Sequence, residues 1–314
     1  TPAAWSVLAD YFRPNKLALP ISVYLMGPYL GAGLAMIAGA EVLDWSRDVE
    51  QVSVPIVGVV APWQATFIAV GLPGVLIAGL LATIREPKRK GRQGAMTEVP
   101  GWRAVLLYMW QRKQVYAALH LGVPFIVVML YGLQGWTPTI LLRVYGWDLA
   151  DAGRIYGTLA LVAGSAGVLS GPVLSRYLLG RGVPDAPLRV AVLGATMATL
   201  SLATLPVQSS GEMALVSIGC ASFFVTLPLA LITTVMQEVT PNNMRGVVNG
   251  MYVVTTNVLG LALGPTLVAA STDYIFQDTL AVAKSLALVA VFVGPIAVYL
   301  LNQGRRSYIE LGNV

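Results

Sequence analysis

The feature that most constrains this fold is a long run without charge near the end of the chain. From Gly246 to Thr272 no Asp, Glu, Lys or Arg occurs. An α-helix rises about 1.5 Å per residue, so about twenty such residues cross the roughly 30 Å apolar core of a bilayer. Similar runs recur along the chain, separated by Gly, Pro, Asn or charge clusters. We therefore expect eight membrane-spanning helices, at about 16–40, 62–84, 115–136, 153–178, 187–207, 212–236, 247–270 and 281–302.

The composition favours a membrane protein over a large soluble one. Of the 314 residues, 56% are hydrophobic and 11% are charged, against about 25% charged residues in an ordinary soluble domain. The net charge of +5 could suggest nucleic acid, but basic residues in a membrane protein mark its cytoplasmic side, so we expect no nucleic-acid partner. One cysteine and one histidine argue against a metal site, and we predict no cofactor.

The distribution of positive charge predicts an orientation. If the eight spans alternate, the loops on one face hold most of the Lys and Arg residues, and the other face keeps Arg47, Arg143, Arg154 and Lys284. Cytoplasmic loops carry the excess of Lys and Arg. We therefore expect a basic cytoplasmic linker at 85–113 and a cytoplasmic C-terminus. Residues 100–114 of the linker suit a short helix at the membrane surface or an extension of the next span.

Two stretches of the chain repeat one outline: a Pro-Asn turn, a basic residue, a tyrosine and a glycine-rich span. The matching positions are Pro14-Asn15 with Pro241-Asn242, Tyr24 with Tyr252, and Leu30-Gly31 with Leu259-Gly260. The first span then corresponds to the seventh and the second to the eighth, a period of six helices. Two six-helix units that run the same way form a parallel repeat, and four helices are expected upstream of residue 1.

The repeat divides the chain into three regions. Residues 1–84 would hold the tail of helix 4 with helices 5 and 6 of an N-terminal bundle. Residues 85–113 would be the basic cytoplasmic linker, and residues 114–314 the C-terminal six-helix bundle, helices 7 to 12, with its tail. The expected partners are therefore the lipid bilayer and the missing N-terminal helices of the same protein.

Together these features resemble the major facilitator superfamily (MFS) of secondary transporters. Residues 8–35 resemble its junction between helices 4 and 5, and residues 171–182, GPVLSRYLLGRG, resemble its loop between helices 8 and 9. Residues 238–269 resemble bacterial Spinster-like members, as do STDYIFQD and KSLALV after them. The resemblance covers essentially the whole chain. In the 171–182 loop Ser175 stands where the family has Asp, which puts the usual charge lock between helices in question.

The resemblance implies an all-α polytopic membrane protein with the MFS fold, lacking about four N-terminal helices and placed in a bacterial inner membrane. It implies a secondary active transporter, not an enzyme. A small organic solute, with amphipathic and anionic molecules among the candidates, would cross by alternating access coupled to protons. Two alternatives stay open: an integral-membrane enzyme acting on lipid, and a truncated fragment without transport activity. An enzyme would need a His, Asp or Glu cluster at one face, which the sequence does not offer.

Polar side chains inside the spans are the candidates for solute contact, because each is costly in lipid. We predict Tyr131, Gln134 and Trp136 in the third span, Tyr252, Thr255, Thr256 and Asn257 in the seventh, and Tyr24 in the first. Hydrogen bonding between helices is the alternative role for the seventh-span group. An anchor at the membrane interface is the alternative for Trp136.

The remaining candidates concern protons, gates and packing. His120, near the start of the third span, is the candidate proton relay because its ordinary pKa lies near neutrality, and a structural imidazole is the alternative. Arg176, Arg181 and Arg245 are candidates for gating loops. Glycines four apart let helix backbones approach, and we expect packing at Gly27 and Gly31, Gly153 and Gly157, Gly167 and Gly171, and Gly260 and Gly264.

Overall fold

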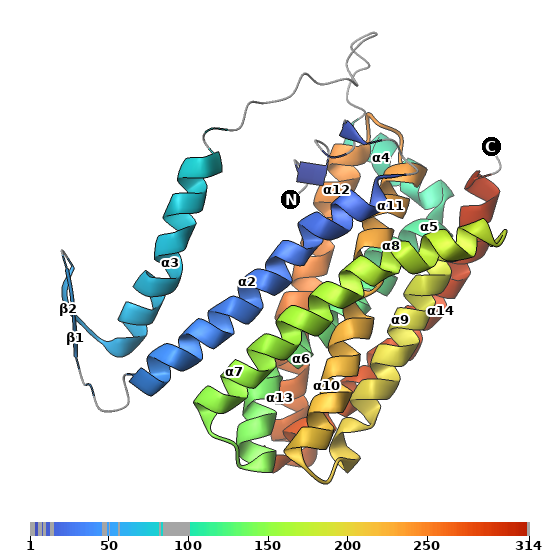
Figure 1. The fold of residues 1–314 in the computed structure, drawn as a ribbon. Coiled ribbons are helices and arrows are strands. Elements are labelled where there is room, and N and C mark those ends of the chain that lie inside the picture. Colours follow the sequence, from blue (N-terminus) through green and yellow to red (C-terminus); the bar gives the residue numbers. More distant parts are fainter. Residues whose placement is uncertain are drawn as a thin grey trace.

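The helices of the computed structural model run roughly side by side, and they follow the predicted spans (Figure 1). The structure describes residues 4, 5, 8, 11, 12, 16–45, 49, 51–55, 57–81, 83 and 101–312. Eight helical segments within these ranges are long and apolar enough to cross a membrane, the number predicted. The charged first part of the linker, residues 84–100, lies outside the described residues.

The first two spans are joined by a small hairpin. They are α2 (Ala18–Trp45) and α3 (Pro62–Leu81). Strand β1 (Val52–Val54) pairs antiparallel with β2 (Gly58–Val60), with Val52 opposite Val60. The sequence analysis expected helices only. The connection is rich in valine, which favours strands. Gly58, where β2 begins, takes a φ of 92°, a conformation that glycine adopts readily and that turns the chain back toward β1.

The other six spans come from the 114–314 region, and several change winding along their length. In chain order they are α5 (Lys113–Ala117), η3 (Ala118–Gly122) and α6 (Val123–Tyr145); α7 (Leu149–Leu159), η4 (Ala160–Gly164) and α8 (Ser165–Gly180); α9 (Ala186–Ala203) and η5 (Leu205–Val207); α10 (Gly211–Thr226) and α11 (Leu229–Val239); α12 (Arg245–Thr256), η6 (Asn257–Ala262), α13 (Leu263–Ala270) and η7 (Ser271–Phe276); η8 (Thr279–Ala281) and α14 (Val282–Gly312). The segments η3, η4, η6 and η7 are π-helical turns, which occur frequently at functional sites.

Residues 102–111 form a separate helix, α4 (Trp102–Gln111), and do not extend the third span. The helix ends at Arg112, whose φ of −117° and ψ of 34° lie outside the helical range. Val105 is fully buried, whereas Trp102 and Trp110 are exposed. Of the two predicted alternatives for 100–114, the short separate helix is therefore the one observed.

Helix α2, from the first part of the chain, lies in close backbone contact with α7. The two helices run alongside each other in Figure 1 and share many contacts. Neither Gly33 nor Gly157 has room for a side chain: a Cβ on Gly157 would lie 2.8 Å from the Gly33 carbonyl oxygen, and one on Gly33 would lie 2.5 Å from the Gly157 oxygen. The two backbones touch because both positions are glycine.

The other predicted glycine pairs divide into two groups. Those of the C-terminal region lie against neighbouring helices: Gly153 against Ala40, Gly167 against Phe223, Gly171 against Leu227, Gly260 against Val127 and Gly264 against Val128. Gly27 and Gly31 are exposed, and no described atom lies within 4 Å of a Cβ placed on either. The buried face of α2 instead holds Ile21, Ser22, Tyr29, Gly33 and Ala40. Gly27 and Gly31 lie off that face, and their part in helix packing stays a prediction.

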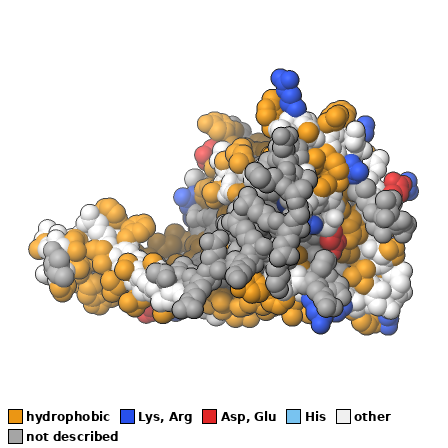
Figure 2. All heavy atoms as spheres, turned by 90° about the horizontal axis from the view of Figure 1, so that it is seen from above, with side chains coloured by type: hydrophobic (Ala, Val, Ile, Leu, Met, Phe, Trp, Pro, Cys, Tyr) orange, Lys and Arg blue, Asp and Glu red, His pale blue; other side chains and the backbone are white. Residues whose placement is uncertain are grey.

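Apolar side chains remain uncovered on two parts of the molecule. Helix α3 stands apart from the other helices in Figure 1 and carries hydrophobic side chains over its surface in Figure 2. Phe67 and Leu76 are each at least 70% exposed. The span that holds α12 and α13 is also little buried, while the span that holds α6 is the most enclosed of the eight. The C-terminal six spans therefore pack around α6.

We predict that Gly157→Ala destabilises the protein by about 1–3 kcal/mol, because the added methyl group overpacks the contact with α2. The measurement is thermal or denaturant unfolding in detergent. Gly250→Ala is the matched control, since Gly250 is also helical and has nothing within 4 Å of the new Cβ; it should be neutral or stabilising by about 0.5–1 kcal/mol. Equal stabilities of the two variants would contradict the contact.

Candidate functional site

Three tyrosines from different spans come together inside the bundle. Tyr29 on α2 and Tyr252 on α12 are buried in the same hydrophobic cluster, and Tyr131 on α6 packs against that cluster. Tyr29 is 8% exposed, and its ring lies against Gly164, where a Cβ would be 3.0 Å from the Tyr29 Cδ1. Tyr131 and Tyr252 were predicted. Their first-span partner is Tyr29, whereas the predicted Tyr24 lies off the buried face of α2 and is 39% exposed.

A line of aromatic rings leads from Tyr252 toward the end of the molecule that carries α4. The His120 ring lies 5.9 Å from the ring of Tyr252 and 5.9 Å from that of Tyr116, centroid to centroid. Tyr108 on α4 continues the line, 6.1 Å from Tyr116. The guanidinium of Arg112 covers the far side of Tyr108 at 4.0 Å. These rings fill the space between the third and seventh spans.

The same tyrosines hold the loop between α11 and α12 in place. The Tyr108 hydroxyl donates to the Val239 carbonyl oxygen at 3.0 Å, and the Tyr116 hydroxyl lies 2.9 Å from the Thr240 hydroxyl. Arg245, a predicted gating residue, donates from Nε to the Thr240 carbonyl oxygen at 3.0 Å. Two tyrosines of α4 and α5 thus bind one short loop at this end of the bundle, and Arg245 of α12 binds the same loop.

His120 occupies the π-helical turn η3 and is 8% exposed. Its Nε2 lies 3.4 Å from the Val248 carbonyl oxygen, and its Nδ1 is buried without a hydrogen-bond partner among the described residues. Pro124 follows four residues later and has no N–H, so it cannot donate a helical hydrogen bond to the His120 carbonyl. The imidazole therefore has one nitrogen with unused hydrogen-bonding capacity next to Tyr116 and Tyr252.

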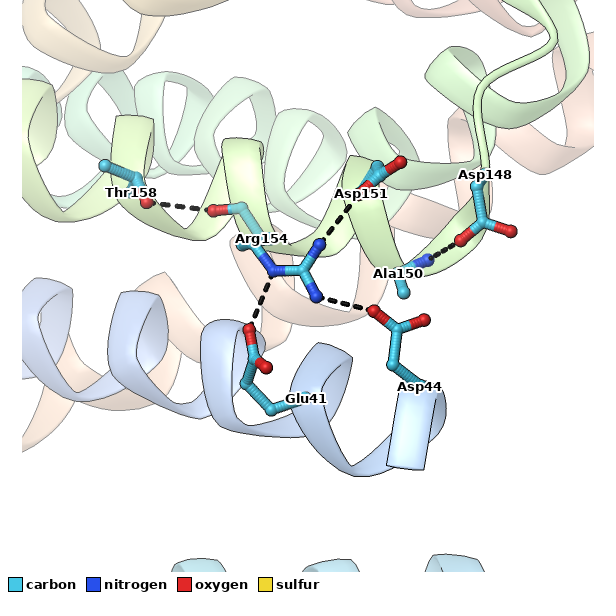
Figure 3. Close-up of polar contacts among 7 residues, drawn as sticks. All are labelled: Glu41, Asp44, Asp148, Ala150, Asp151, Arg154 and Thr158. Atoms are coloured by element: carbon cyan, nitrogen blue, oxygen red, sulfur yellow. Dashed lines mark hydrogen bonds and ion pairs between the residues drawn. The ribbon is translucent and has the colours of Figure 1, made fainter. Parts of the chain in front are cut away.

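At the opposite end of the molecule, Arg154 links α7 to α2 through ion pairs (Figure 3). Its Nε binds Glu41 at 2.7 Å, its NH2 group binds Asp44 at 2.6 Å, and its NH1 group binds Asp151 on its own helix at 2.7 Å. The Arg154 side chain is 33% exposed, so water and salt weaken each pair. Arg154 was expected on this face, but its pairing with Glu41 and Asp44 could not be predicted, because these acids lie on a helix far away in sequence.

A second ion cluster lies on the α4 side, between α8, α9 and α14. Asp185 is 1% exposed and accepts from Arg189 Nε at 2.8 Å and from Arg305 Nε at 2.7 Å. Burial alone raises the pKa of Asp185, but the hydrogen bonds and charges of Arg305 and Arg189 outweigh it and hold the pKa below its ordinary value. The depressed pKa stabilises the folded protein at pH values above about 3.9, the ordinary pKa of an aspartate. This stability is lost as the pH falls through the lower folded-state pKa.

The Asp185 cluster forms an ion pair between helices at the α8–α9 loop, where Ser175 itself carries no charge. Ser175 is buried, and Arg176 and Arg181 are exposed. Neither arginine makes an ion pair with a described residue, and Arg181 lies over the ring of Tyr177 at 4.5 Å. The acid that ties the α8–α9 loop to another helix is Asp185, ten positions after Ser175. Its role was missed because a single carboxylate in a loop gives no sequence signal of what it binds.

The other residues predicted to contact the solute differ in their hydrogen bonds. Trp136 Nε1 donates to the Pro265 carbonyl oxygen on α13 at 3.0 Å. Thr255 and Asn257 donate to carbonyl oxygens of their own helix, and Asn257 is exposed. Gln134 is half-buried and makes no hydrogen bond with a described residue. The Thr256 hydroxyl is buried without a hydrogen-bond partner among the described residues. Of this group, Thr256, Gln134 and the tyrosines keep polar atoms that a solute could use.

Comparison with known proteins agrees with this architecture. The family model described as Major Facilitator Superfamily matches residues 1–265. The chain belongs to the Major Facilitator Superfamily. It is therefore an integral membrane protein, and Spinster homologues are among the proteins that it resembles. The chain is 24% identical to "Protein spinster homolog 3" of Danio rerio over 285 residues, which cover 85% of this chain and 54% of that protein.

Two further similarities extend over nearly the whole chain. An "MFS-type efflux pump" of Mycolicibacterium smegmatis is 26% identical over 322 residues, covering 99% of this chain and 69% of that protein. The crystal structure of a bacterial homologue of the human lysosomal transporter Spinster, inward-facing and unoccupied, matches with a TM-score of 0.64 at 21% identity. It covers 98% of this chain and 74% of that one. The chain thus spans about half the length of the Danio rerio relative and has the fold of the Major Facilitator Superfamily.

We predict that Tyr116→Phe loosens the loop between α11 and α12 and costs about 0.5–1.5 kcal/mol of stability, the usual net value of one hydrogen bond. Hydrogen exchange of residues 239–245 and thermal unfolding measure the two effects. Tyr274→Phe is the control, since Tyr274 is 80% exposed and has no hydrogen bond with a described residue. If the loop exchanges at the same rate in both variants, the Tyr116 bond does not hold it.

Proposed function

We propose that this chain is part of a secondary active transporter that moves a small organic solute across the membrane by alternating access. The observation that carries the proposal is the line of contact between α2 and the helices α7 and α8, which we call the α2 seam. At Gly33 and Gly157 the backbones touch, and at one end Arg154 joins the two sides ionically. A close contact whose ion pairs are exposed to water suits two halves that rock against each other.

We assign α2 and α3 to the N-terminal half and the six spans from α5 to α14 to the C-terminal half. The uncovered apolar faces of α3 and of the α12–α13 span are where further helices of an N-terminal half would pack. Eight of twelve spans would be about two thirds of such a protein. The chain covers 69% of the Mycolicibacterium smegmatis relative, which is consistent with this division. The linker between the two halves, residues 85–113, and the C-terminus would face the cytoplasm of a bacterial cell, because most Lys and Arg residues lie on the face of the protein that holds them.

We place solute contact at Tyr131, Tyr252 and Gln134, with Tyr29 facing them from the other half. Hydroxyl and amide groups bind a solute through hydrogen bonds and carry no fixed charge. The group also lies on both sides of the α2 seam, so its geometry changes when the halves move. The solute class that fits is a small organic molecule with polar and apolar parts, with amphipathic anions among the candidates.

We place the proton step at His120. It is the chain's one histidine, and an imidazole exchanges protons near neutral pH. The ring touches Tyr252, one of the solute candidates, so protonation would change the hydrogen bonding beside the solute. Its unpartnered Nδ1 can take the proton.

Membership in the family favours transport over the alternative of a lipid-acting enzyme. Among the described residues no three His, Cys, Asp or Glu side chains gather to hold a metal ion. The site consists of hydrogen-bonding side chains where several helices meet, and such groups can bind and release a solute without breaking a covalent bond.

We predict that proteoliposomes with the protein accumulate one member of a panel of amphipathic organic anions when a pH gradient is imposed, and that an uncoupler abolishes the accumulation. His120→Gln should remove accumulation but keep exchange of solute across the membrane, since exchange needs no net proton movement. Tyr274→Phe should behave as the unchanged protein. A solute that equilibrates without ever accumulating would contradict proton coupling, and chemical change of lipid without solute flux would contradict transport.

A further inference from the structure

A cavity of about 450 Å³ opens between the beginning of α9 and the end of α14, apart from the proposed solute site. Asp185 forms its floor, and its walls include the side chains of Arg189, Asn302, Gln303, Arg305 and Arg306. Three arginines against one carboxylate leave the cavity positive. It lies on the α4 side of the molecule, where α14 ends (Figure 1).

The arginines are held so that their outer nitrogens stay available. Asp185 binds both Arg189 and Arg305 through Nε. Asn302 takes one further N–H of Arg305. The two terminal nitrogens of Arg189 have no hydrogen bond with a described residue, and Arg306 has neither a hydrogen bond nor an ion pair there. Asp185 therefore positions two guanidinium groups, and the cavity keeps several N–H donors unused.

The same face of α14 continues from the cavity as an apolar stripe. Phe292, Ile296, Tyr299, Gln303 and Arg306 follow one another at intervals of three or four residues, which places them on one side of a helix. Phe292 is 73% exposed and Ile296 is 36% exposed. A basic cavity thus lies at the end of an uncovered apolar track.

Helix α9 lines the other side of this track. It packs along α14, and Leu193 and Leu200 lie one and three turns from Arg189 on the same side of the helix. They are 40% and 54% exposed. The two helices therefore present the same order of chemistry: guanidinium groups at the end, then apolar side chains along the membrane-spanning length.

We infer that this cavity binds the phosphate group of an anionic phospholipid. Guanidinium N–H groups match phosphate oxygens in geometry and charge, and basic pockets between spans are known to bind lipid headgroups. The apolar track selects a lipid over free phosphate, because it offers the acyl chains a surface that begins where the headgroup is held. The inference needs only the membrane insertion of the chain and does not depend on the proposed transport.

The test is native mass spectrometry of the purified 314-residue chain in a non-ionic detergent, titrated with phosphatidylglycerol or with phosphatidylcholine of the same acyl chains. We expect phosphatidylglycerol to bind preferentially. Arg306→Gln should weaken this binding about five-fold, the equivalent of about 1 kcal/mol for one basic side chain near an anionic lipid. Arg176→Gln, which removes an exposed base from the end of the adjacent helix α8, should bind as the unchanged protein does.

Three results would overturn the inference. Equal binding of the two lipids would show that the phosphate charge is not recognised. Equal losses in Arg306→Gln and Arg176→Gln would show a general attraction to the basic face. Competition by inorganic phosphate as effective as that by phosphatidylglycerol would make the cavity a site for free phosphate. Because Arg306 bonds to no described residue, its substitution should leave the unfolding temperature unchanged, which separates lost binding from lost folding.

Discussion

The backbone contact between α2 and α7 is the constraint on which the rest of the structure depends. Gly33 and Gly157 bring two helices from distant parts of the chain within the distance of touching main chains. That approach puts the ring of Tyr29 against Gly164 and near Tyr131 and Tyr252. A bulkier residue at either glycine would separate α2 from the C-terminal helices and disperse this group.

Two ion clusters mark opposite ends of the bundle and differ in character. The Arg154 cluster joins α2 to α7 across the seam and is partly exposed, so its pairs are weak and easily exchanged with water. The Asp185 cluster lies within the C-terminal helices, and its carboxylate is buried. The first suits a contact that opens and closes. The second suits a fixed joint that keeps α14 beside α9.

The number and order of the spans could be predicted from the sequence, because uncharged runs depend on composition and spacing alone, and the family could be predicted because several stretches resemble its motifs. The sequence could not predict which side of a helix is buried. Gly27 and Gly31 have the same four-residue spacing as Gly153 and Gly157, yet among the described residues only the second pair lies against a neighbouring helix. The choice of Tyr29 over Tyr24, and the partners of Asp185 and Arg154, likewise depend on how helices rotate against one another, and no local pattern records that rotation.

The measurement that tests this account most directly is the distance between spin labels on the two sides of the seam, at the end held by Arg154. With Cys220 replaced by Ser, labels at Trp45 on α2 and Val144 on α6 report on that end in a lipid bilayer. We predict that Arg154→Gln shifts the distance distribution to longer values, and that Arg143→Gln, which removes an exposed base from the same face, does not. Identical distributions in the two variants would contradict the claim that Arg154 holds the halves together.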